Sequence, residues 1–168
     1  MNRIITYPRS GAHYLQHLIL TDSSQNIDLS HYGVFDNSFI ITVARNPFDS
    51  IKSTMAMKKH YFPDTYLDND YIEYYIDVYT FLNKHANLVI DYEDLVSFPE
   101  EISKSVCGAL GFKKMPRKHH MMKDDKDYQY LVSSKTVKEY EEEYFSKQDI
   151  EKCYPHYLEL LSKSIKLT

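Results

Sequence analysis

The chain has 168 residues, 43% of them hydrophobic and 26% charged, and its formal net charge is −4. This length predicts a single domain over residues 1–168 that can bury a sizeable core. The acidic excess argues against nucleic acid as the main partner, and no apolar run approaches the roughly 18–20 residues of a membrane span. A strand so near Met1 leaves no room for a signal peptide, so we expect a cytoplasmic protein with Cys107 and Cys153 reduced.

Short apolar runs alternate with helical patterns along the chain. Ile4 and Ile5 open a β-branched strand, which Pro8 ends because proline cannot donate to a sheet ladder. The elements expected after it are helix 12–21, strand 27–31, strand 39–44, a helix from Pro47, helix 65–86, strand 88–92, a helix from Pro99 to a C-cap at Gly111, a surface helix over 137–145 and a last helix from Ser146 to about Lys166.

This alternation predicts the fold class α/β, a three-layer domain with a central, mostly parallel sheet covered by helices. Ligands of such sheets bind beyond the carboxyl ends of the strands. Arg9, His31 and Arg45 each lie just past the end of an expected strand. We therefore expect these three side chains to converge on one site.

The stretch 9–14 joins the first strand to the first helix. Ser10 and Gly11 allow a sharp turn, and N–H groups at a helix N-terminus attract anions. Arg9 adds a fixed positive charge with forked donors. These residues indicate a site for a phosphate-like group. The first glycine and the Lys-[Ser/Thr] pair of a full phosphate loop are missing, so an ordinary turn with a surface arginine is the alternative.

Several segments, in the right order, resemble the PAPS-dependent sulfotransferase family, where PAPS is 3′-phosphoadenosine 5′-phosphosulfate. Residues 7–11 (YPRSG) resemble the phosphosulfate loop Y-P-K-S-G-T-T-W, and residues 43–53 (VARNPFDSIKS) resemble the motif V-x-R-N-P-x-D-x-x-x-S. Residues 30–31 (SH) and 92–95 (YEDL) resemble two further family segments. The resemblance is weak after residue 112. It implies a P-loop NTPase-like sulfotransferase fold and transfer of a sulfuryl group from PAPS to a hydroxyl or amine.

The resemblance also implies roles for single residues. Arg9 occupies the family's catalytic lysine position, where a cation stabilises the charge that develops on the departing phosphate. Arg45 and Ser53 match the pair that binds the 3′-phosphate. The residues that would cradle the phosphosulfate, mainly through backbone N–H groups, are Ser10, Gly11, Ala12, His13 and Tyr14. Ala12 and His13 replace the family's threonines, so two hydroxyl contacts are lost.

His31 matches the general base of the family, and histidine titrates near the working pH. Glu93 is an alternative base, because some members use a glutamate. Arg117, Lys118 and residues 133–135 are candidates for covering the cofactor. No metal is expected, since sulfuryl transfer in this family needs none and the chain shows no carboxylate cluster of the kind that holds magnesium.

Two other functions stay open. The changed loop and the weak final third also fit a non-catalytic protein that binds PAP, the product nucleotide. A small-molecule kinase would need a loop lysine and a carboxylate that holds magnesium, so this class is disfavoured. The acceptor is a small molecule such as a phenol, a carbohydrate, a lipid or a peptide, and its pocket would include the tyrosine-rich stretch 66–81.

Overall fold

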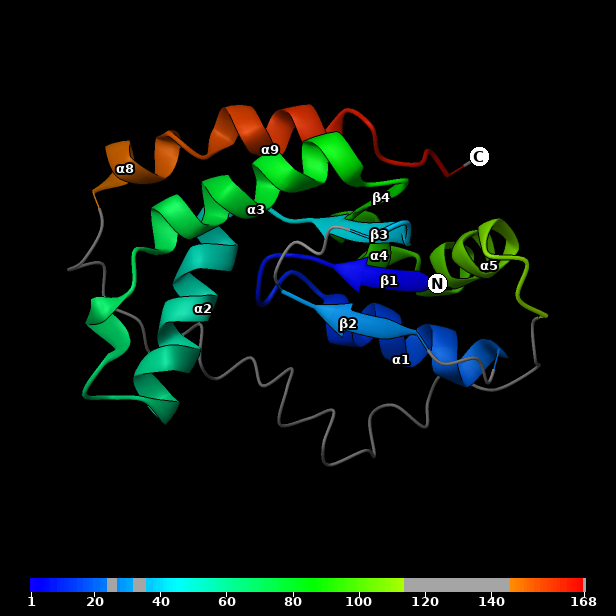
Figure 1. Ribbon diagram of the computed structural model, residues 1–168, viewed down its shortest axis with the longest axis horizontal. Helices are drawn as coiled ribbons and strands as arrows, with labels where there is room; N and C mark the ends of the chain where they lie inside the picture. The colour runs from blue at the N-terminus through cyan, green and yellow to red at the C-terminus, as the bar shows by residue number, and fades with distance from the viewer. Residues whose placement is uncertain (24–26, 32–35, 114–145, 168) are drawn as a thin grey trace.

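Helices and strands alternate along the chain, and the strands form one sheet (Figure 1). The computed structural model describes residues 1–23, 27–31, 36–113 and 146–167. The strands are β1 (Asn2–Ile5), β2 (Asp28–Ser30), β3 (Phe39–Ala44) and β4 (Leu88–Asp91). Their order is β2-β1-β3-β4, and every pairing is parallel. The α/β class and the parallel sheet expected from the sequence are confirmed.

Strands β1, β3 and β4 each supply side chains to two cores, because successive residues point to opposite faces of a sheet. In β1, Ile4 lies in one core and Ile5 in the other, and in β3 the same holds for Ile41 and Ile40. The register pairs Ile4 with Ile41, so matching faces align across the strands. Burial on both faces explains why β3 is an almost continuous apolar run.

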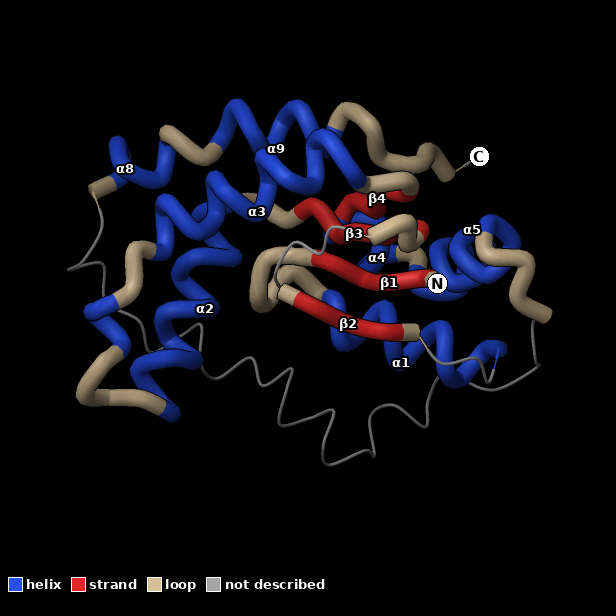
Figure 2. The backbone as a smooth tube through the Cα atoms, in the orientation of Figure 1, coloured by secondary structure: helices blue, strands red, loops and turns tan. Residues whose placement is uncertain are grey.

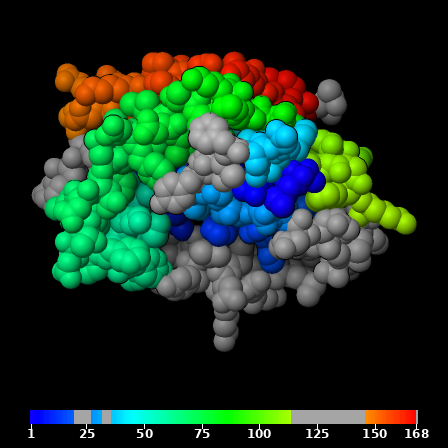
Figure 3. Space-filling model, in the orientation of Figure 1, coloured from blue at the N-terminus to red at the C-terminus, as the bar shows by residue number. Residues whose placement is uncertain are grey.

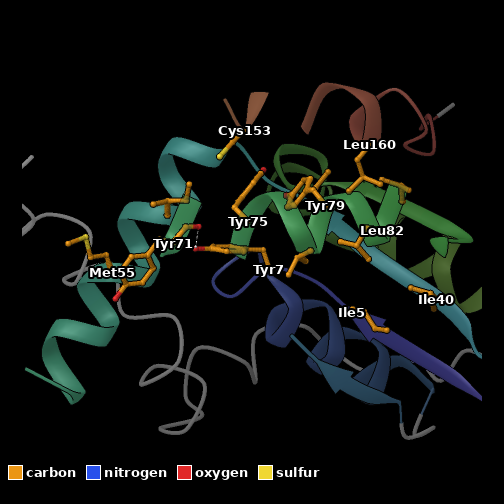
Figure 4. Packing of buried hydrophobic residues seen from close by; sticks show 14 of the residues in the cluster. Ile5, Tyr7, Ile40, Met55, Tyr71, Tyr75, Tyr79, Leu82, Cys153 and Leu160 are labelled. Atoms are coloured by element: carbon orange, nitrogen blue, oxygen red, sulfur yellow. Dashed lines mark hydrogen bonds between the residues drawn. The ribbon is translucent and has the colours of Figure 1, made fainter. Parts of the chain in front are cut away.

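Helices α2 (Pro47–Tyr61), α3 (Tyr71–His85) and α9 (Tyr154–Leu161) cover one face of the sheet. Tyrosines form much of this core: Tyr7, Tyr75 and Tyr79 are fully buried among aliphatic side chains (Figure 4). The rings of Tyr75 and Tyr79 stack with their centroids 4.0 Å apart. The tyrosine-rich helix therefore contributes its large rings to the core.

The opposite face is covered by α1 (Ala12–Ser23), α4 (Tyr92–Ser97) and α5 (Pro99–Ala109). Leu15, Leu95 and Ile102 pack there against the sheet with no exposed surface. Gly111 ends α5 as predicted, with φ +66° and with the Phe112 N–H donating to Cys107 O at 2.8 Å. Helices on both faces give three layers.

Several expected boundaries were wrong. The helix expected over 65–86 consists of a 3-10 turn, η1 (Tyr66–Asp68), and α3. Asp70 separates them, because its carboxylate caps α3 by accepting from the N–H groups of the second and third helical residues. The strand expected to include Tyr92 ends at Asp91, whose carboxylate caps α4.

The helix expected from Ser146 to Lys166 is divided into α8 (Lys147–Glu151) and α9. Ser146 caps α8 as predicted, by accepting from the Asp149 N–H at 3.1 Å. Pro155 lies in the first turn of α9, where its missing N–H costs no helical hydrogen bond, whereas it could not continue the helix of α8. In the space-filling view, α8 and α9 lie along α3 (Figure 3).

The helix expected over 137–145 and the covering residues Arg117, Lys118 and 133–135 lie outside the described residues. Among the helices that are described, none combines the length and the apolar character needed to cross a bilayer.

Candidate functional site

The carboxyl ends of β1, β2 and β3 lie at the same edge of the sheet (Figure 2). β1 lies between β2 and β3, so its loop has a strand end on each side. The register pairs Ile5 with Ser30, and the Thr6 N–H extends the ladder by donating to Ser30 O at 3.2 Å. This pairing places His31, the residue after Ser30, beside the start of the loop that carries Arg9.

The loop after β1 has an unusual backbone. Arg9 has φ +63° and Gly11 has φ +88°, a region that non-glycine residues seldom occupy outside constrained sites. A Cβ at Gly11 would lie 3.2 Å from Leu95 Cδ2 and from two ring carbons of Tyr92, so any other residue would crowd these two side chains of α4. Ser10, which lies between Arg9 and Gly11 in the chain, has a fully buried side chain. Backbone turns of this kind form concave anion sites.

Arg9 extends from this loop toward α2. Its Nε donates to Ser53 Oγ at 3.0 Å, and Ser53 is buried in α2. The next hydroxyl of α2, that of Thr54, lies 3.1 Å from Pro8 O. Burial lowers the pKa of Arg9, and the neighbouring charge of Arg45 lowers it further. The resemblance pairs Ser53 with Arg45, whereas the structure places Ser53 against Arg9.

Arg45, at the end of β3, lies against the same loop. Its Nη1 donates to the backbone carbonyl of Arg9, and its Cζ lies 4.2 Å from the centroid of the Tyr92 ring. Its Nε is buried and has no hydrogen-bond partner among the described residues, and none of their carboxylates forms an ion pair with it. Removing a charge from water is costly without a counter-charge, so this guanidinium is suited to an anionic ligand.

His31 is held in one tautomer by the first residue of the loop. Its Nδ1 lies 2.9 Å from Thr6 O, and because a carbonyl only accepts, Nδ1 must carry the proton. In the neutral ring Nε2 then has a free lone pair. Burial lowers the pKa of His31, although the hydrogen bond to Thr6 raises it in part. The ring is therefore neutral near pH 7 and able to accept a proton.

The first turn of α1 completes the cluster. Ala12 is buried, and His13 and Tyr14 are half-buried. The ring centroids of His13 and His31 are 6.0 Å apart. Burial lowers the pKa of His13, and the charges of His31 and Arg9 lower it further. Two neutral imidazoles and two guanidiniums thus lie around one loop, with the N-terminal end of α1 beside them.

The sequence interpretation missed several residues that build this site. Tyr75 and Tyr79 contact the backbone of Arg45, Tyr74 contacts that of His31, and Tyr92 lies under the Arg45 guanidinium. The sequence predicted the stretch 66–81 as part of an acceptor pocket and Tyr92 as part of a strand, but not the partners of these side chains. The alternative base Glu93 is exposed in the first turn of α4.

No family model matches this chain, and no curated protein matches it in sequence. The function therefore rests on the geometry of the site. No group of three or more His, Cys, Asp or Glu side chains that could hold a metal ion occurs in the described part of the chain.

Proposed function

We propose that this protein binds PAPS at the carboxyl edge of its sheet and transfers the sulfuryl group to a hydroxyl or amine. The observation that carries the proposal is a pair of guanidiniums at one loop: Arg9 lies in the loop after β1, and Arg45, at the end of β3, donates to the Arg9 carbonyl. Burial lowers the pKa of Arg9, and the charge of Arg45 lowers it further, as like charges do when they are close. Keeping such a pair together costs free energy, which an anion with more than one phosphate-like group offsets.

In this proposal the loop after β1 and the first turn of α1 bind the 5′-phosphosulfate. Arg9 stabilises negative charge on the oxygen that links sulfur to phosphate as that bond breaks. Ser53, which accepts from Arg9 Nε, orients the guanidinium. Arg45 binds the 3′-phosphate. The P-loop-type sulfotransferase fold implied by the sequence belongs to the same proposal.

His31 serves as the general base. Its Nε2 accepts the proton of the acceptor hydroxyl while the acceptor oxygen forms the new bond to sulfur, and PAP leaves as the other product. The neutral ring and the Nδ1–H tautomer support this role. A base in this position typically contributes about 10²–10⁴-fold to the rate.

A non-catalytic PAP-binding protein is the second candidate. Ala12 supports it, because a buried methyl group stands in the loop where the resemblance expects a hydroxyl. A kinase is less well supported. Asp91, the carboxylate at the end of β4, caps α4 by accepting from the Glu93 N–H at 3.0 Å, which engages one of the oxygens a magnesium site would use.

The first test is thermal unfolding with PAP, and with ADP as the nucleotide that lacks the 3′-phosphate. PAP at about 100 times its dissociation constant adds roughly 2.7 kcal/mol to the free energy of unfolding, which raises the midpoint by about 5–10 °C. We expect Arg45→Ala to abolish the preference for PAP. Arg3→Ala is the matched control, because Arg3 lies in β1 and pairs with Asp36 away from the loop. Equal shifts with PAP and ADP in the wild type would refute the proposed cofactor.

Transfer is then measured from labelled PAPS to a phenol, a sugar, a lipid and a tyrosine peptide. Arg9→Ala should abolish transfer and leave most PAP binding intact, because Arg45 still holds the 3′-phosphate. PAP binding without transfer to any acceptor class would favour the non-catalytic candidate. Transfer that depends on magnesium would favour the kinase.

A further inference from the structure

Helix α3 lies against the two strand ends that carry His31 and Arg45. Asp70 starts the helix, and its buried face places Tyr75 and Tyr79 one turn apart, with Tyr74 beside them. These three side chains reach the carboxyl edge of the sheet with their hydroxyl groups. Each of these hydroxyls contacts a backbone atom there.

The peptide groups of Arg45 are held by two of these hydroxyls. The Arg45 N–H donates to the Tyr79 hydroxyl at 2.9 Å. The Tyr75 hydroxyl donates to Arg45 O at 2.9 Å, and the Tyr79 hydroxyl lies 3.1 Å from the same oxygen. Burial raises the pKa of Tyr79 to about 12 and raises that of Tyr75 further. Both hydroxyls therefore keep their protons near neutral pH.

The third hydroxyl, that of Tyr74, contacts the residue that follows β2, His31. Tyr74 donates to the backbone carbonyl of His31 at 2.7 Å. The Tyr74 ring also packs against the Tyr7 ring, with centroids 5.2 Å apart, and Tyr7 is fully buried. His31 is thus held at two points, by Tyr74 at its carbonyl and by Thr6 at its Nδ1.

We propose that Tyr74, Tyr75 and Tyr79 are positioning residues, through which α3 sets the orientation of His31 and Arg45 relative to the loop after β1. The consequence for transfer rests on the proposed function, whereas the positioning itself does not. β2 and β3 have no hydrogen bond to each other, since β1 separates them. Through these hydroxyls α3 contacts both strand ends, so it couples the proposed base to the proposed 3′-phosphate site.

The test uses tyrosine-to-phenylalanine variants, which remove one oxygen and keep the ring. Tyr74→Phe and Tyr79→Phe address the two halves of the site, and Tyr75→Phe replaces Tyr79→Phe if that variant does not fold. Tyr71→Phe is the matched control on the same helix, because its hydroxyl donates to Tyr66 O away from the site. Each variant is first checked for a cooperative thermal transition.

Two NMR readouts need neither nucleotide nor turnover. Nitrogen shifts of the His31 ring report its tautomer, and we expect Tyr74→Phe to change the Nδ1–H form into a mixture, while Tyr79→Phe leaves it intact. The Nε–H signal of Arg45 reports its burial, and we expect Tyr79→Phe to broaden or remove it, while Tyr74→Phe does not. His13 and Thr6 contact His31 in the wild type and are unchanged in every variant, so they do not account for a difference between variants.

The same variants separate this inference from the proposed function. Tyr79→Phe should reduce the preference of the protein for PAP over ADP at least about fivefold. Tyr74→Phe should lower kcat for sulfuryl transfer and leave KM unchanged. If the wild type binds no PAP, the proposed function fails and the NMR signals still decide the positioning. Unchanged signals in Tyr74→Phe and Tyr79→Phe, or the same changes in Tyr71→Phe, would overturn the inference.

Discussion

Alanine substitution at three glycines separates backbone strain from crowding in the loop after β1. Gly108 lies in α5, and its added Cβ meets no neighbour within 4 Å in the described part of the chain. Gly111 has the same open surroundings but φ +66°. Gly11 combines φ +88° with contacts of 3.2 Å to Tyr92 and Leu95. The three variants therefore differ by one physical factor at each step.

The expected costs follow from these factors. Gly108→Ala should stabilise the protein by up to about 0.5–1 kcal/mol, because alanine favours a helix. Gly111→Ala should cost about 1–2 kcal/mol, the penalty of the left-handed backbone for a residue with a Cβ. Gly11→Ala should cost that penalty and a further 1–3 kcal/mol or so for crowding. In a chain of this size each kcal/mol lowers the midpoint by about 2–4 °C.

The assay is urea unfolding of the four proteins, followed by thermal unfolding with and without PAP. Gly11→Ala should also reduce the PAP shift, because an added Cβ displaces the Tyr92 ring that lies under Arg45. Gly111→Ala should leave that shift unchanged. If Gly11→Ala costs no more than Gly111→Ala, the loop does not press on α4 and the argument for a tightly fitted site is refuted.

Two further predictions concern caps and acid stability. Asn46→Ala and Asp70→Ala each remove a helix cap, and each should lower the free energy of unfolding by about 1 kcal/mol in urea. Only Asn46→Ala should weaken PAP binding, because Asn46 lies beside Arg45. Equal effects of the two variants on PAP binding would contradict this. Burial lowers the pKa of His31, so the unfolded state binds more protons and stability falls as the pH drops below about 6.5. His31→Gln should reduce this acid-side loss, and His60→Gln, at an exposed position, should not.

Each error in the predicted elements has a local cause that hydrophobic periodicity alone does not detect. The helix expected over 65–86 is interrupted because Asp70 caps α3, and the strand expected over 88–92 ends early because Asp91 caps α4. Pro155 divides the last helix. Caps and prolines act within a single helical turn, so hydrophobic periodicity averaged over a longer window does not detect them.

The sequence by itself determined the α/β order, the buried strands and the position of Arg9, His31 and Arg45 after strand ends. Those features follow from local periodicity and from the geometry of parallel sheets.

Tertiary structure alone decided which groups meet. Arg9 reaches Ser53 across 44 positions of the chain, and Tyr79 reaches Arg45 across 34. Hydrogen bonds form only within about 3 Å, and the packing of α2 and α3 on the sheet sets distances of that order. The tautomer of His31 was decided in the same way, because the Thr6 carbonyl faces its ring only after β2 pairs with β1.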